Sequence, residues 1–129
     1  MSYDLTIRAN ETFSAFAECQ PLAKFMRRLP KIKPNGERAY VLDDPPRRHM
    51  EIDLELVDDG GDILDDEAYT EFNCVRLHIP QEFLSATFQR DYFPTALAIA
   101  QRLGWQLFDD QTEKLVTQVA EKPWWRFWG

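Results

Sequence analysis

A chain of 129 residues with 44% hydrophobic and 29% charged residues has the composition of one ordinary globular domain that can bury a core. Its formal net charge of −7 repels phosphate backbones, which excludes general nucleic-acid binding from the expected functions. The sequence shows no secretory signal, no membrane-spanning apolar run and no metal or redox spacing of Cys19 and Cys74, so we expect a reducing, cytoplasmic location.

The first half of the chain alternates between strand and helix patterns. Residues 3–8 alternate in polarity with a period of two, which predicts a half-buried strand. Residues 21–29 carry one apolar stripe at helical spacing, and Pro30 ends this predicted helix. A loop over 31–37, a strand over 38–42 and a turn over 43–48 follow. Residues 49–56 are the clearest predicted strand, with alternate apolar and polar side chains.

The second half begins with an acidic loop over 58–67, whose residues do not match the calcium-binding template of an EF-hand. Residues 73–79 alternate again, and this pattern places Cys74 on the outward side of a strand. The apolar segments around Cys19 and Cys74 nevertheless favour free, buried cysteines. Residues 81–90 are ambiguous. A helix is predicted over 92–103, with Gly104 as its stop signal. A strand over 105–108, a turn and a last extended stretch over 115–119 complete the series.

These elements predict an α+β domain over residues 1–121. Its sheet is expected to have five to six strands, mainly antiparallel, with the two helices packed on one face, because each helix has a single apolar stripe and the strands alternate. Residues 122–129 are interpreted as a separate tryptophan-rich C-terminal tail.

Two segments carry a resemblance to known proteins. The chain opens with MSYDL (residues 1–5), and near its end IAQRLGW (residues 99–105) is followed by Asp109 and Gln111. This pattern resembles a loose group of small bacterial α+β proteins, mostly uncharacterised, some of which look like immunity or accessory proteins encoded beside toxins. In that group Asp-Pro-Gln is typical where this chain has Asp110 in the middle. The resemblance covers both ends of the domain and implies a fold and an interaction role, but no catalytic residue.

One strand face offers candidate residues for an enzyme. His49, Glu51 and Asp53 alternate on one predicted strand, so their side chains project the same way about 7 Å apart. If the strand over 73–79 is a neighbour, His78 joins them as a general base or a metal ligand, together with Arg76. Side chains spaced in this way along a nearly flat face diverge from a single ion, and any solvated sheet face is polar, which favours a structural interpretation.

The tail is the most unusual feature of the sequence. Three of the four tryptophans fall within five positions, and the candidate binding residues are Trp124, Trp125, Arg126, Phe127 and Trp128. Tryptophan and arginine are the residues that contribute most often to binding hot spots. Packing against the chain's own domain, docking into another protein or a second copy, and insertion at a membrane interface remain open, although only Lys122 and Arg126 would assist the last.

The sequence therefore favours a non-enzymatic protein-interaction module, immunity-type or accessory, with no cofactor. Its expected partner is another protein or a second copy of itself, bound through the tail, and not a nucleic acid or a membrane. A small metal-dependent or hydrolytic enzyme that uses His49, Glu51, Asp53 and His78 is the first alternative. A homo-oligomeric structural protein is the second.

Overall fold

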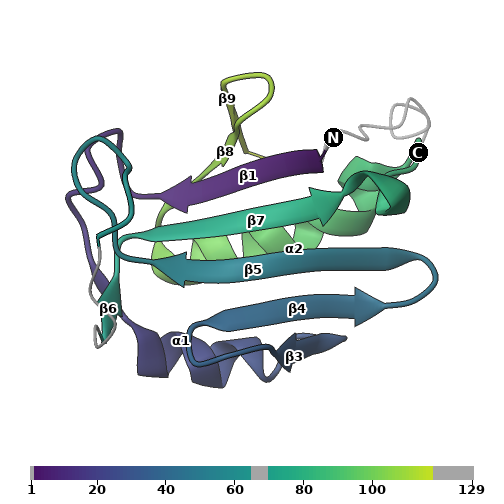
Figure 1. Cartoon of the computed structure of the whole chain (residues 1–129), viewed down its shortest axis with the longest axis horizontal. Helices are drawn as coiled ribbons and strands as arrows, with labels where there is room; N and C mark the ends of the chain where they lie inside the picture. Colours follow the sequence, from purple (N-terminus) through teal and green to yellow (C-terminus); the bar gives the residue numbers. More distant parts are fainter. Residues whose placement is uncertain (1, 65–69, 118–129) are drawn as a thin grey trace, which may run out of the picture.

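The computed structural model describes residues 2–64 and 70–117, which form an α+β fold with one large sheet (Figure 1). The large sheet has seven strands in the order β3-β4-β5-β7-β1-β8-β9, and every pairing in it is antiparallel. A second sheet pairs β2 with β6. The strands are β1 (Ser2–Arg8), β2 (Ala17–Glu18), β3 (Ile32–Pro34), β4 (Ala39–Asp44), β5 (Arg48–Glu55), β6 (Glu71–Phe72), β7 (Cys74–Pro80), β8 (Gln106–Asp109) and β9 (Lys114–Val116).

The helices are α1 (Cys19–Met26) and α2 (Phe88–Leu103), with a short 3₁₀ helix, η1 (Gln81–Phe83), before α2. Figure 1 shows α2 running behind β7 and β5, while α1 lies near β3 and β4. The buried side chains of both helices join one core cluster with the inward side chains of the sheet. This cluster includes Leu22 and Met26 from α1, Tyr92, Ala96 and Ile99 from α2, and Leu5, Ile52 and Leu77 from the strands.

Helix α2 ends where the sequence predicts. Gly104 adopts a left-handed conformation with φ of 71°, and the amide of Trp105 donates to the carbonyl of Ala100 at 2.9 Å. This is the hydrogen-bonding pattern of a glycine-terminated helix, so the predicted stop is confirmed. The start is one turn earlier than predicted, at Phe88. The ring of Phe88 packs 4.7 Å from that of Tyr3, a tertiary contact that helical periodicity alone does not reveal.

The predicted number of strands, five to six, is too low. The sequence interpretation treated residues 31–37 as a loop, but Ile32 to Pro34 pair with β4 as an edge strand. It also missed β2 and β6, which have two residues each. Strands of two or three residues hold less than two periods of alternation, so their sequences carry no readable pattern. The last strand, β9, ends at Val116, and positions 118–119 of the predicted extended stretch lie outside the described residues.

The expected burial of Cys74 as a free cysteine is confirmed, although it lies on the face to which the strand alternation assigns solvent. This side chain does lie on the face opposite the main core, but it is fully buried there, in a second cluster with Phe13 and Val57. The buried side chain of Asn73 fixes the segments that cover Cys74, because its amide donates to the carbonyl oxygens of Phe13 and Val57 at 3.0 and 2.8 Å. Burial raises the pKa of the Cys74 thiol to about 12, so the thiol stays protonated and unreactive at neutral pH.

The two segments that carry the sequence resemblance lie next to each other in the fold. The hydroxyl of Tyr3 donates to the buried carboxylate of Asp109. The side chain of Gln111 bonds the backbone of Asp4 in both directions, accepting from its amide and donating to its carbonyl at 2.8 Å. It also donates to Asp109 at 2.9 Å. The spacing of Asp109 and Gln111 at the end of β8 therefore has a structural role here, and we call this set of contacts the terminal clasp.

We predict that Tyr3→Phe lowers the free energy of unfolding by about 1–3 kcal/mol, since it removes a hydrogen bond to a buried carboxylate. Tyr40→Phe is the matched control, because the Tyr40 hydroxyl makes no hydrogen bond within the described residues. Its effect should stay within about 0.5 kcal/mol. Urea denaturation of both variants measures the difference, and equal effects would show that the clasp does not depend on the Tyr3 hydroxyl.

Candidate binding groove on the open sheet face

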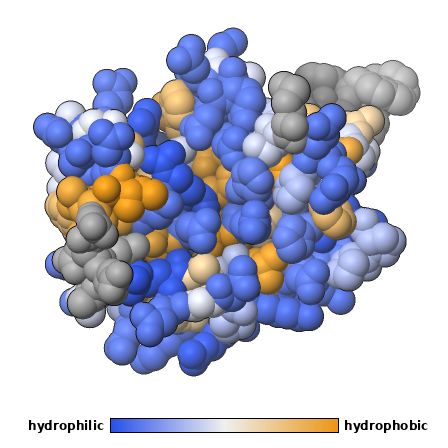
Figure 2. Space-filling view, viewed as in Figure 1, coloured by the Kyte–Doolittle hydropathy of each residue, from blue (hydrophilic) through white to orange (hydrophobic). Residues whose placement is uncertain are grey.

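The sheet face opposite the helices carries a groove of about 460 Å³ over β5, β7 and β1. Figure 2, which views this face, shows hydrophilic side chains over the middle of the sheet with apolar atoms between them. The groove is lined by five carboxylates, one guanidinium and one imidazole: Asp4, Glu51, Asp53, Glu55, Asp110, Arg76 and His78. Carboxylates therefore dominate the charge of this surface, which we call the acidic groove.

Strand register brings one row of the groove together. Asp4 on β1 and Glu51 on β5 both stand opposite His78 on β7. Nδ1 of His78 lies 2.8 Å from a carboxylate oxygen of Asp4, and its Nε2 lies 3.9 Å from one of Glu51. The two carboxylates thus flank the imidazole from both sides.

The next row is built around Arg76. Its Nε lies 2.6 Å from a carboxylate oxygen of Glu55, and its terminal nitrogen donates to the carbonyl of Gly61 at 2.8 Å. On the β1 side, the Thr6 hydroxyl donates to the carboxylate of Asp110 at 2.9 Å. Glu55 and Asp110 therefore each have a partner from the protein itself, although burial raises the pKa of both carboxyl groups.

Asp53 differs from these carboxylates because it has no partner. It stands opposite Arg76 in the register of β5 and β7, yet within the described ranges its side chain makes no hydrogen bond and no ion pair. Its pKa is raised, first by burial and then by the neighbouring charge of Glu51, while His78 lowers it. The acidic groove thus contains a half-buried carboxylate whose charge is not compensated by any group within bonding distance.

The four residues of the enzyme hypothesis do not converge on one point. Glu51, Asp53 and His78 share the acidic groove, but His49 lies outside the residues that line it. His49 lies 4.0 Å from Asp43 on β4, and its ring packs 5.4 Å from that of Phe83. Within residues 2–64 and 70–117, no group of three histidine, cysteine or acidic side chains could hold a metal ion.

Three acidic members of the groove were not identified from the sequence. Asp4, Glu55 and Asp110 lie on three different elements, far apart along the chain. The alternation of β1 and β5 already places Asp4 and Glu55 on polar strand faces. What the pattern lacks is the order of the strands, since only the adjacency of β5, β7 and β1 turns separate polar faces into one surface.

The candidate binding residues of the tail, Trp124, Trp125, Arg126, Phe127 and Trp128, lie outside the described residues. Among the helices that are described, none is long and apolar enough to cross a membrane. Comparisons of the chain with protein-family models, with curated proteins and with solved structures found no match in any of the three. The likeness to immunity-type proteins consequently stays a prediction.

We predict that Asp53→Asn stabilises the protein at pH 7. Because burial raises the pKa of Asp53, the native state holds this proton more tightly than the unfolded chain, so ionisation of the carboxyl group destabilises the fold. This cost develops as the pH rises above 3.8, the ordinary pKa of the group, and is absent below it.

The stability gain of Asp53→Asn in urea denaturation should therefore be largest near neutral pH and should disappear as the pH falls toward 3.8. Asp59→Asn, which removes an exposed carboxylate from a loop, is the control and should show no such gain. A loss of stability for Asp53→Asn at pH 7 would mean that the Asp53 charge is compensated.

Proposed function

We propose that this chain is a non-enzymatic protein-interaction module whose acidic groove binds a cationic segment of a partner protein. The observation that carries the proposal is the unpaired carboxylate of Asp53 in the groove. A lysine or arginine side chain of a partner would compensate this charge, and the flanking Glu51 would contribute to the same contact.

The surroundings of Asp53 support binding rather than catalysis. His78 and Arg76, the groups that could take part in proton transfer or anion stabilisation, are engaged with Asp4 and Glu55. A catalytic site needs a nucleophile or an activated water near such groups, and the only thiol on this face, Cys74, is fully buried. An acidic groove whose imidazole and guanidinium groups are already engaged fits electrostatic recognition of a basic partner.

The immunity-type or accessory role suggested by the resemblance is compatible with this mode of binding. An acidic protein that covers a basic surface of a toxin or effector would use the complementarity that the groove offers. We place the protein in the cytoplasm on the basis of its two free cysteines, Cys19 and Cys74, which suit a reducing compartment. The tail, residues 122–129, is proposed as a second contact with the partner, next to the domain of residues 1–121.

The proposal predicts that neutralising the groove abolishes partner binding. The double substitution Glu51→Gln and Asp53→Asn removes two charges and keeps the shape of both side chains, so the fold should be retained. Affinity capture from extracts of the native host, quantified by mass spectrometry, should identify a partner with a basic segment. Its affinity for the variant should fall at least about tenfold, which corresponds to about 1.4 kcal/mol, and its binding to the wild type should weaken as salt rises.

The matched control is Glu11→Gln with Asp59→Asn, which removes two exposed carboxylates outside the groove. The control should capture the partner as the wild type does. A partner that binds both double variants equally well would rule out the acidic groove as its binding site.

The tail gives a separate prediction. Replacement of Trp124, Trp125 and Trp128 by alanine should abolish partner capture and leave the melting temperature of the domain unchanged, because hot-spot tryptophans act at the interface. A variant that unfolds would show instead that the tryptophans pack against their own domain. The solution mass of the wild type, measured by light scattering, distinguishes a separate partner from a second copy of the chain.

A further inference from the structure

A second cleft lies on the helical side of the molecule, and its charge is opposite to that of the acidic groove. It has a volume of about 250 Å³ and lies between α1 and the end of α2. Three cations and one carboxylate line it, together with Gln20, Pro21 and Phe25: the charged residues are Lys24, Arg28, Arg102 and Glu18. We call it the basic cleft.

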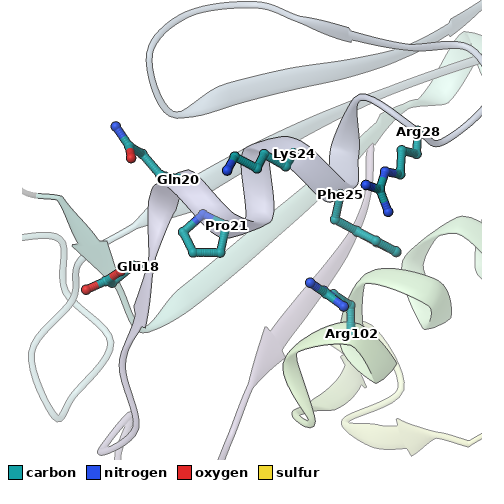
Figure 3. Close-up of a pocket in the computed structure, with 7 residues that line it drawn as sticks. All are labelled: Glu18, Gln20, Pro21, Lys24, Phe25, Arg28 and Arg102. Atoms are coloured by element: carbon teal, nitrogen blue, oxygen red, sulfur yellow. The ribbon is translucent and has the colours of Figure 1, made fainter.

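The arginines of the basic cleft come from different elements and meet at one aromatic ring. Arg28 follows α1, and Arg102 belongs to the last turn of α2. Figure 3 shows their guanidinium groups near Phe25, with Glu18 at the opposite end of the cleft beyond Pro21. The guanidinium carbon of Arg102 lies 5.6 Å from the centre of the Phe25 ring, a contact that helps to fix the direction of this arginine.

None of the three cations is paired with a carboxylate. Within the part of the chain that is described, Lys24, Arg28 and Arg102 form no ion pair, whereas Arg47, Arg48 and Arg76 do. A favourable interaction with the dipole of its own helix explains why a cation stands near the end of each helix. It does not explain why two guanidinium groups from separate parts of the chain line the same small cavity.

We propose that the basic cleft binds the oxyanion group of a small molecule, a phosphate or a carboxylate, between Arg28 and Arg102. Guanidinium groups bind such groups through paired, charge-assisted hydrogen bonds, and Lys24 adds a third positive charge. The net charge of −7 restricts the ligand to a small anion, because the field of the whole chain repels a polyanion such as a nucleic acid. The site lies on a different face from the acidic groove and does not depend on it.

The test is an NMR titration of the ¹⁵N-labelled full-length protein at pH 7, with inorganic phosphate in one arm and acetate in the other. Sodium chloride keeps the ionic strength constant, so that screening does not change between points. Saturable shifts of amides in residues 18–28 and 100–104 are expected. Saturation by phosphate alone assigns the ligand to phosphate esters, and saturation by acetate as well assigns it to carboxylates or phosphates.

The variants Arg28→Gln and Arg102→Gln should each weaken this binding at least about tenfold, the loss expected for one charge-assisted hydrogen bond. Arg27→Gln is the matched control, since Arg27 is the neighbouring exposed arginine and does not line the cleft. It should leave the affinity within about twofold of the wild type. Shifts that do not saturate in either arm, or that are reduced equally in Arg27→Gln, would overturn the proposal.

Discussion

The pairing of β1 with β7 and β8 is the constraint on which the rest of this structure depends. β1 lies at the start of the sequence and β8 about a hundred residues later, so pairing of the two strands closes a long loop at an entropic cost. The terminal clasp fixes that pairing, because Asp109 and Gln111 bond the side chain of Tyr3 and the backbone of Asp4. With β1 held between β7 and β8, the inward side chains of the sheet form a single surface for both helices.

The same constraint builds the acidic groove on the other side of the sheet. Gln111 holds the backbone of Asp4, and the side chain of Asp4 is thereby directed toward His78 on β7. Asp110, between the two clasp residues, accepts from Thr6 on the groove side. Because side chains alternate along β8 and the following turn, the adjacent residues Asp109 and Asp110 have different roles. Asp109 supports the fold, and Asp110 contributes charge to the acidic groove. Asp109 and Gln111, which carry the sequence resemblance, therefore have a structural role and lie beside the acidic groove.

The sequence predicts the long elements of this fold because periodicity is an average over many residues. It identifies α1, α2, β1, β5 and β7, and it places the stop of α2 at Gly104. The prediction fails where tertiary contacts determine the secondary structure. The first turn of α2 depends on the packing of Phe88 on Tyr3, and β3 depends on its pairing with β4. The apolar surroundings of Cys74 favour its burial, but the alternation of β7 does not reveal the loop segment around Phe13 that covers it. The sequence identified Glu51, Asp53 and His78 as candidate neighbours. Only the structure shows that no described residue forms a hydrogen bond or an ion pair with the side chain of Asp53.

The charge of this protein is separated in space rather than spread over its surface. A uniform excess of carboxylates would serve solubility alone, and it would leave each cation near an acidic neighbour. Here carboxylates gather over β5, β7 and β1, while Lys24, Arg28 and Arg102 line the cleft between the helices and, among the described residues, form no ion pair. Ionisation of a carboxyl group that is partly buried raises the free energy of the native state, and the neighbouring charge of Glu51 adds to this cost, as the raised pKa of Asp53 indicates. We therefore propose that the two surfaces bind ligands of opposite sign, which would compensate these charges.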